Sequence, residues 1–339
     1  MFFLRAFFLG LTITHTGMPM ADSAIVIAHR GASGYLPEHT LPAKAMAHAM
    51  GADFIEQDIV LTRDGVPIVL HDIYLQSTTD IALRFPDRVR TDGRFYAIDF
   101  TLAEIRSLRA HERSEFSGSG EERAVFPERY PLAEGLFTIP TLDEEITLIE
   151  GLNHSTGRTT GLYIELKAPQ FHRQHGFDMA KIILATLDKR GLAEQTGRVY
   201  LQCFDDRTLR YLREELRTPL PLIQLIGENN WGEDGDTDYD IMKTSEGLAS
   251  IAAYADGIGP WIGQIVVGIE DDGQPIFSDL VAKAKAYGLL VHPYTFRREQ
   301  VPAGFDSFEA LHRAFFEVLK VDGIFTDFPD VTRAYLDGR

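Results

Sequence analysis

The sequence predicts a TIM-type (βα)8 barrel, because short β-rich segments alternate with longer amphipathic segments almost throughout the 339 residues. Eight core strands are expected, at residues 24–28, 54–60, 162–166, 198–203, 222–226, 257–259, 289–291 and 323–325. Helices are expected between them, at residues 41–49, 179–189, 206–215, 278–287 and 308–319. Eight such units favour a closed barrel over an open doubly wound sheet, and barrels of this size commonly form one domain.

One long interval interrupts this alternation. After a further short strand expected at residues 67–70, about ninety residues precede the strand at 162–166, which is too long for an ordinary loop. The interval contains helix-like segments at 102–108 and 142–149. We therefore expect an insertion at about residues 73–160, after the second strand, packed over or beside the barrel mouth. A separate small domain is the alternative.

Composition limits the class of protein. Hydrophobic residues make up 45% of the chain and charged residues 24%, as in ordinary globular proteins. The formal net charge is −17, so the overall field repels polyanions and argues against a nucleic-acid partner. Cys203 is the single cysteine, which excludes a disulfide framework and a thiolate zinc site. An acidic protein with local cations suits a small anionic substrate.

The first 23 residues are typical of a secretory signal peptide. Arg5 precedes an apolar stretch at residues 6–13, and small or turn-forming residues follow, with cleavage expected between Ala21 and Ala24. A buried N-terminal helix is the alternative. No later segment approaches eighteen uninterrupted apolar residues, so we expect no stable membrane insertion. The expected mature chain is residues 24–339, located in the periplasm or secreted.

Candidate catalytic residues begin directly after the first strand. In a barrel, residues just past the carboxyl end of a strand line the active-site mouth. His29 in that position can exchange protons near neutral pH, and Arg30 can hold a phosphate through two parallel hydrogen bonds. On its own, this short motif would indicate a capping or core histidine instead.

Carboxylates follow on the second strand. Glu56 and Asp58 are two residues apart, so they project from the same face of the strand. If that face points into the barrel, the two carboxylates repel each other unless a cation lies between them. A solvated pair on the outward face is the alternative.

Two further segments supply matching groups. His71 follows the short strand at 67–70, so it also lies at a strand end. Glu165 and Lys167 share one face of the strand at 162–166. Each of these segments alone could have a purely structural role. Because all of them lie at strand ends, however, they point to one site.

Together these residues contain the parts needed to cleave a phosphodiester. Glu56, Asp58 and Glu165 form an all-oxygen metal site that favours Ca²⁺ or Mg²⁺ over zinc. A bound cation would polarise the phosphoryl group, with Arg30 and Lys167 contacting the phosphate. Acid and base roles fall to the two histidines, His29 and His71, in an order that the sequence leaves open.

The sequence resembles the glycerophosphodiester phosphodiesterases, and especially their bacterial periplasmic branch. The resemblance spans nearly the whole mature chain. It rests on residues 29–40 (HRGASGYLPEHT), 56–58 (EQD), 69–72 (VLHD), 165–169 (ELKAP), 201–205 (LQCFD), 291–295 (VHPYT) and 323–330 (GIFTDFPD), and in the insertion on 84–88 (RFPDR) and 92–100 (DGRFYAIDF).

The resemblance implies the same acid/base, phosphate and metal residues, with calcium as the typical metal of this branch. It also implies substrates such as glycerophosphocholine and glycerophosphoethanolamine, which would give glycerol 3-phosphate and an alcohol. Two departures from the broader family, His39 in place of Asn and Cys203 in place of Ser, touch none of the proposed roles. Phe204 and Tyr294, at strand ends, are expected to hold the glycerol, with a core or rim role as the alternative.

Two other functions are alternatives to this prediction. A phospholipase D-like enzyme acting on lysolipids should carry an apolar or basic interfacial patch near the mouth, whereas the insertion is rich in charged and polar residues. A non-enzymatic binding protein would need cations but not a paired acid and base. The headgroup preference stays open, and a homodimer is compatible with the sequence.

Overall fold

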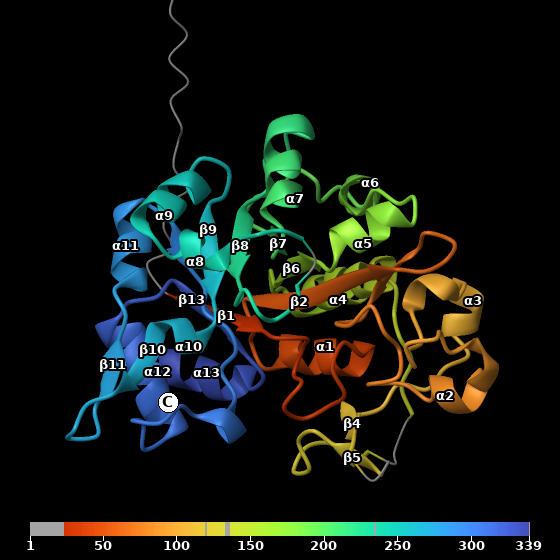
Figure 1. The fold of residues 1–339 in the computed structure, drawn as a ribbon, viewed down its shortest axis with the longest axis horizontal. Coiled ribbons are helices and arrows are strands. Elements are labelled where there is room, and N and C mark those ends of the chain that lie inside the picture. The colour runs from red at the N-terminus through yellow and green to blue at the C-terminus, as the bar shows by residue number, and fades with distance from the viewer. Residues whose placement is uncertain (1–23, 119–120, 133–135, 234, 339) are drawn as a thin grey trace, which may run out of the picture.

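The computed structural model describes residues 24–118, 121–132, 136–233 and 235–338, and the predicted signal peptide, residues 1–23, lies outside them. Eight parallel strands form a barrel in the order β12-β9-β8-β7-β6-β2-β1-β13 (Figure 1). Their bounds are β1 Ile25–Ala28, β2 Phe54–Leu61, β6 Gly161–Leu166, β7 Val199–Cys203, β8 Leu222–Ile226, β9 Gly257–Pro260, β12 Leu290–Val291 and β13 Gly323–Thr326.

Backbone hydrogen bonds between the first and last strands of this order bring the sheet close to a full circle. The amide of Asp322 donates to the carbonyl of Val291 at 3.1 Å, and the amide of Phe325 donates to Pro293 at 3.0 Å. The amide of Phe296 then donates back to the carbonyl of Phe325 at 2.8 Å. The predicted (βα)8 barrel is therefore confirmed, and all eight predicted core strands are present.

Aromatic side chains close the barrel interior below its mouth. Tyr163 and Tyr200 stack with ring centroids 4.9 Å apart, and Phe54 meets Tyr200 edge-on at 5.0 Å. Side chains alternate along a strand, so Glu56 and Glu165, each two residues further along, point into the same interior one layer higher. The aromatic layer thus forms the floor on which polar groups gather.

The barrel strands are surrounded by helices whose apolar faces pack on them. The main helices are α1 Leu41–Ala49, α4 Leu142–Thr156, α6 Met179–Lys189, α7 Asp206–Arg210, α9 Ser245–Ile251, α11 Leu280–Ala286, α12 Phe308–Arg313 and α13 Pro329–Leu336. Two π-helical segments, η3 Tyr211–Glu215 and η5 Ala314–Val318, continue α7 and α12. Helices predicted at 41–49 and 179–189 match α1 and α6.

The remaining elements are short and lie in connections. They are α2 Ile81–Arg84, α3 Leu102–Ile105, α5 Pro169–Gln174, α8 Tyr239–Met242, α10 Ile262–Ile265, the 3-10 helices η1 Pro86–Arg88, η2 Ala97–Asp99 and η4 Arg298–Gln300, and the strands β3 Pro67–Val69, β4 Ser114–Phe116, β5 Glu122–Ala124, β10 Val266–Ile269 and β11 Pro275–Phe277. None of the described helices is long and apolar enough to cross a membrane.

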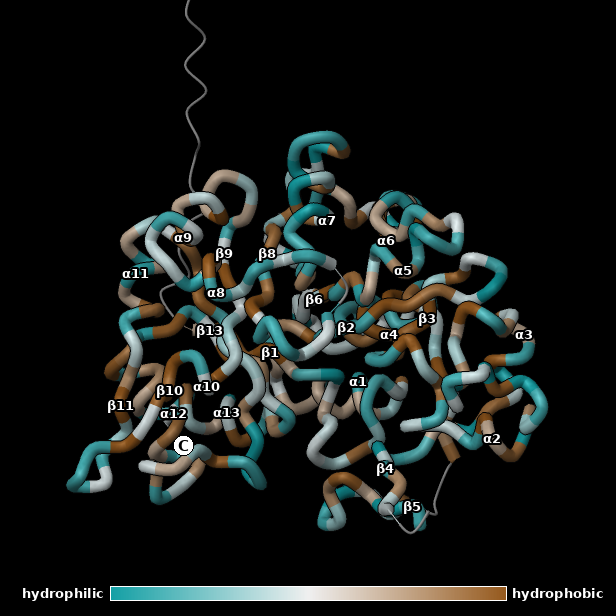
Figure 2. The backbone as a smooth tube through the Cα atoms, in the orientation of Figure 1, coloured by the Kyte–Doolittle hydropathy of each residue, from teal (hydrophilic) through white to brown (hydrophobic). Residues whose placement is uncertain are grey.

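The segment predicted as an insertion, residues 73–160, has two different parts. Its first part has a small core of its own, which includes Phe100 and Ile139 and continues onto Val60 of β2 and Ile68 of β3. Figure 2 shows hydrophobic residues concentrated along β2 and β3, beside this part. Helix α4, by contrast, packs on α1 and contributes to the main core, so it belongs to the outer ring of the barrel.

Candidate active site

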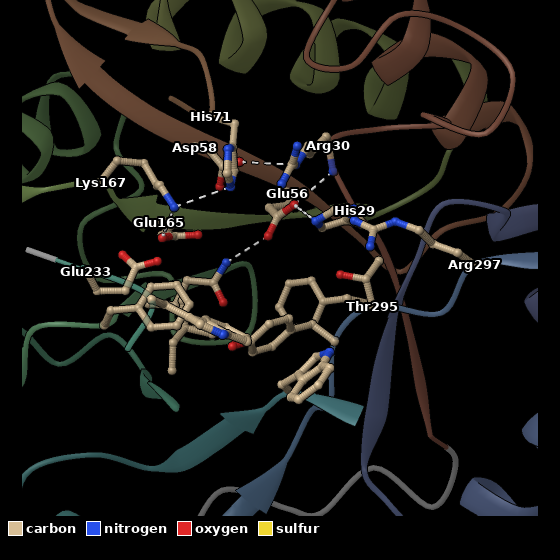
Figure 3. A pocket seen from close by; sticks show the side chains of 17 residues that line it. His29, Arg30, Glu56, Asp58, His71, Glu165, Lys167, Glu233, Thr295 and Arg297 are labelled. Carbon is tan, nitrogen blue, oxygen red and sulfur yellow. Dashed lines mark hydrogen bonds and ion pairs between the residues drawn. The ribbon is translucent and has the colours of Figure 1, made fainter. Parts of the chain in front are cut away.

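A cavity of about 270 Å³ lies at the carboxyl ends of the barrel strands (Figure 3). All nine side chains singled out from the sequence line it, together with others that the sequence did not reveal. The predicted nine are His29, Arg30, Glu56, Asp58, His71, Glu165, Lys167, Phe204 and Tyr294.

Three buried carboxylates face one another in this cavity. Glu56, Asp58 and Glu165 are 3%, 1% and 5% exposed, and one oxygen from each lies within 4.8 Å of the others. Burial and the neighbouring carboxylates raise the pKa of Glu56 well above its usual value, and burial with the nearby charge of Asp58 raises the pKa of Glu165 to about 8. A hard divalent cation would offset this repulsion, so the three residues fit a Ca²⁺ or Mg²⁺ site.

Neighbouring groups hold these carboxylates in place. The side-chain amide of Gln202 donates to Glu56 Oε1 at 2.9 Å, and the amide of Arg30 donates to Glu56 Oε2 at 2.8 Å. Lys167 Nζ lies 2.8 Å from Glu165 Oε1. Asp58 Oδ1 is buried with no hydrogen-bond partner among the described residues, which leaves it available to a cation.

His29 is oriented by a carboxylate from the other end of the chain. Its Nδ1 donates to Asp327 Oδ1 at 2.6 Å, which leaves Nε2 facing the cavity, 3.8 Å from Glu56 Oε2. Asp327 in turn accepts from Arg129 at 2.7 Å and from Arg297 at 2.9 Å. Burial and the charge of Arg30 lower the pKa of His29 to about 4, so the imidazole is neutral near pH 7 and its Nε2 atom carries a free lone pair.

His71 has the same arrangement with a partner next to it in sequence. Its Nδ1 donates to Asp72 Oδ1 at 2.6 Å, and Asp72 Oδ2 accepts from Arg113 at 2.8 Å. The Nε2 atom of His71 lies 3.5 Å from Lys167 Nζ. Burial, with the charges of Arg30 and Lys167, lowers the pKa of His71 to about 3. The cavity therefore has two imidazoles, each with Nε2 presented to it.

The two cations predicted to contact phosphate also line the cavity. Arg30 has a left-handed backbone with φ of 57° and is followed by Gly31 at φ of 92°. A side chain at Gly31 would meet the backbone of Ala43 at 2.9 Å, so this turn requires glycine. The guanidinium of Arg30 is held by Glu38 at 2.9 Å. Lys167 lies opposite, and Figure 3 shows both side chains directed at the space beside the carboxylates.

An aromatic wall completes the cavity. The rings of Phe204 and Tyr294 meet edge-on at 6.0 Å, and the Tyr294 hydroxyl donates to the carbonyl of Ile226 at 2.8 Å. Trp231 and Trp261 form the outer part, with ring centroids 5.5 Å apart and exposed fractions of 42% and 41%.

Sequence reasoning missed several lining residues, namely Gln202, Trp231, Glu233, Thr295 and Arg297. Gln202 and Arg297 stand in or beside segments that carried the family resemblance, so position at a strand end was a usable signal. Trp231 and Glu233 come from the loop after β8, where no spacing marks them.

A buried polar chain connects this site to the outer helices. His39 Nε2 donates to Asp58 Oδ2 at 2.8 Å, and Lys44 Nζ donates to His39 Nδ1 at 3.1 Å. Lys44 also donates to the backbone carbonyl of Glu56 and lies 3.2 Å from Glu145 Oε2 on α4. Lysine can only donate, so the contact with Nδ1 fixes which nitrogen of His39 carries the proton. Burial opposes ionisation of Asp58, but His39 holds the pKa of that carboxyl well below its usual value.

Comparisons of the sequence with a family model and with known proteins point to the same family. The model of the glycerophosphoryl diester phosphodiesterase family matches residues 29–331. A glycerophosphodiester phosphodiesterase of Haemophilus influenzae is 41% identical over 335 residues, covering 94% of this chain and 91% of the relative. Another, from Treponema pallidum, is 35% identical and covers 93% of this chain and 92% of its own length.

Solved structures agree on the fold. A putative glycerophosphoryl diester phosphodiesterase from Silicibacter pomeroyi superposes with a TM-score of 0.67 at 25% identity, covering 94% of this chain and 95% of that one. A phosphodiesterase from Oleispira antarctica was solved in complex with the product sn-glycerol-3-phosphate. It superposes with a TM-score of 0.61 at 20% identity, covering 93% of this chain and 97% of that one.

Proposed function

The chain belongs to the glycerophosphoryl diester phosphodiesterase family, and we propose that its barrel-mouth site hydrolyses glycerophosphodiesters to glycerol 3-phosphate and an alcohol. The observation that carries this proposal is the position of two histidines beside three buried carboxylates in one cavity. Each histidine is hydrogen-bonded to an aspartate. The findings give no support to the alternative considered from the sequence, a phospholipase D-like enzyme acting on lysolipids.

The residues of the site divide into phosphate-binding and proton-transferring groups. A divalent cation held by Glu56, Asp58 and Glu165 would supply positive charge that polarises the phosphoryl group. Arg30 and Lys167 contact the phosphate oxygens and neutralise their charge.

Proton transfer belongs to His29 and His71. One histidine accepts the proton of the attacking oxygen at Nε2, and the other donates a proton from Nε2 to the leaving alkoxide. Asp327 and Asp72 keep each ring in the required tautomer and stabilise its charged form. The aromatic wall of Phe204 and Tyr294 packs on the carbon atoms of the glycerol.

We propose calcium as the metal, with magnesium as the alternative. The supporting observation is the ligand chemistry, since three carboxylates with no nitrogen or sulfur ligand suit hard cations.

We also propose that the chain is exported, on the strength of the signal-like residues 1–23. N-terminal sequencing of the protein from a periplasmic fraction should find a start between Asp22 and Ile25. An intact Met1 in that material would contradict export by cleavage.

The enzymatic proposal is tested with a substrate panel. Purified protein with calcium is incubated with glycerophosphocholine, glycerophosphoethanolamine and lysophosphatidylcholine, and the phosphorus products are identified by ³¹P NMR. We expect glycerol 3-phosphate from the two glycerophosphodiesters and no reaction with the lysolipid. Lysophosphatidic acid as the main product would instead indicate the phospholipase D-like activity.

A further inference from the structure

A second cavity, of about 250 Å³, adjoins the catalytic cavity. The two share His29, Arg30, His71 and Arg297, so a phosphate held by these residues borders both spaces. Much of the outer wall of the second cavity comes from the first part of the insertion. The insertion residues in that wall are Glu112, Arg113, Val125, Phe126 and Arg129.

A phosphodiester carries two ester arms, and the two cavities offer one space for each. The catalytic cavity contains the carboxylate triad, which binds a divalent cation in our proposal. An ammonium group placed there would be repelled by that cation, since like charges close together in a shielded site interact strongly. A neutral glycerol arm suits the metal side, and a charged arm would therefore extend into the second cavity.

Glu112 gives the second cavity a specific chemical character. Its side chain lines the cavity, is 3% exposed, and has an Oε2 atom with no hydrogen-bond partner among the described residues. A buried carboxylate oxygen without a partner is costly, and a ligand that supplies a cation removes that cost.

The arginine side chains in this wall form ion pairs with carboxylates other than Glu112, which receives the backbone amide of Arg113 and the nearby charge of Arg129. Arg113 binds Glu38 at 2.7 Å, and Arg129 binds Asp327 at 2.7 Å. Arg30 and Arg297 are bound in the same way, by Glu38 and Asp327 respectively. Consistent with this, burial and the charge of Glu38 raise the pKa of Glu112 to about 7.

We propose that the second cavity binds the alcohol arm of the substrate and that Glu112 selects a cationic amino alcohol, such as an ethanolamine or choline group. Val125 and Phe126 provide apolar surface for its carbon atoms. This inference rests on the proposed function, and it adds a specificity residue contributed by the insertion.

The test compares two substrates that differ in one charge. Wild-type protein and Glu112→Gln are assayed with glycerophosphoethanolamine and with glycerophosphopropanol, a neutral analogue of similar length. The substitution keeps the shape of the side chain and removes its charge. We expect kcat/KM for the cationic substrate to fall by about tenfold or more, because hydrogen bonds to charged groups are among the stronger ones. The neutral substrate should change by less than about twofold, within the spread of an ordinary neutral substitution.

Two variants serve as controls. Glu115→Gln alters an exposed carboxylate on β4, three residues after Glu112 in the sequence, and should leave kcat/KM for both substrates unchanged. Glu233→Gln removes the charge of a carboxylate that lines the catalytic cavity but not the second cavity. A selective loss of the cationic substrate in Glu233→Gln, but not in Glu112→Gln, would place the ammonium in the catalytic cavity and overturn the inference.

Other outcomes separate this inference from the enzymatic proposal. Equal loss on both substrates in a folded Glu112→Gln protein would refute selection by charge. If that variant does not fold, wild-type protein alone decides the matter, since equal kcat/KM for the two substrates would overturn the inference. A wild-type protein that cleaves neither diester would refute the proposed function itself.

Discussion

At the residue scale, each histidine of the site lies between an aspartate and the cavity. The pairs His29–Asp327 and His71–Asp72 have the same 2.6 Å hydrogen bond from Nδ1, although one pair joins neighbours and the other spans the chain. Both histidines were predicted from their position at strand ends. Asp327 was not assigned a role, because nothing local in the sequence shows that it meets a residue 298 positions earlier.

Replacing either histidine should remove a proton-transferring group without unfolding the protein. We expect His29→Ala and His71→Ala each to lose at least about a hundredfold in turnover, since positioned acids and bases contribute about 10²–10⁴-fold. The measurement is kcat with saturating glycerophosphocholine and calcium, alongside circular dichroism to verify folding. A folded His71→Ala protein with near-normal turnover would remove that residue from the mechanism.

Replacing a proposed metal ligand should lower the affinity for calcium more than it disturbs the fold. Glu165→Gln removes one of three charges around the cation, so we expect weaker calcium binding and activity that recovers only at high calcium. Titration calorimetry and the calcium dependence of kcat measure this effect. Unchanged calcium affinity in the variant would show that Glu165 is not a ligand.

At the scale of elements, a chain of polar contacts from α4 through α1 to β2 connects the outer ring of helices to Asp58 in the carboxylate triad. Lys44 and Glu145 are fully buried, and Lys44 also contacts His39 and the backbone of β2. Removing one charge of a buried pair leaves the other uncompensated, which commonly costs about 3–5 kcal/mol. This series of buried polar contacts therefore contributes to the stability of the fold as well as to the position of Asp58.

A compensating double variant tests this buried pair. We expect Lys44→Met to lower the free energy of unfolding by about 3–5 kcal/mol and the double variant Lys44→Met/Glu145→Leu to recover part of that loss. Urea denaturation in calcium provides the values. Lys283→Met, which breaks a surface pair with Asp279, is the matched control and should cost about 1 kcal/mol or less. Similar losses for the buried and surface variants would contradict the expectation.

The regular elements could be predicted from the sequence, and the irregular ones could not. All eight core strands and helices such as 41–49 were evident because apolar residues recur along them. The division of the interval 73–160 was not evident, since α4 has the same amphipathic pattern whether it packs on an insertion or on the barrel. The loop after β8 brings Trp231 and Glu233 to the site through tertiary packing alone, which leaves no periodic signal.

At the scale of the whole molecule, charge is distributed unevenly. The chain has a net charge of −17, yet Arg30, Lys167 and Arg297 line the catalytic cavity beside the carboxylates. The overall field disfavours polyanions, while the local cations accept one phosphate. A small anion with a single phosphate is the ligand that satisfies both conditions.

The same electrostatics predict that a bound cation stabilises the fold. Without a cation, repulsion among Glu56, Asp58 and Glu165 forces one of them to take up a proton or to move away. We therefore expect chelation to abolish activity and to lower the melting temperature together, and added calcium to restore both. A ligand that binds only the folded state stabilises it by about 2.7 kcal/mol at a hundred times its dissociation constant, which corresponds to a shift of a few degrees.

The experiment measures activity and melting temperature on one preparation, first with chelator and then with calcium, magnesium or zinc. Calcium or magnesium should act on both quantities over the same concentration range, because a single site controls both. Asp58→Asn, which lowers the charge of that site, should need more calcium for either effect. Full activity in rigorously metal-free protein would refute the metal site. Restoration by zinc alone would show that the ligand chemistry differs from an all-oxygen set, since hard cations prefer such ligands and zinc prefers nitrogen or sulfur.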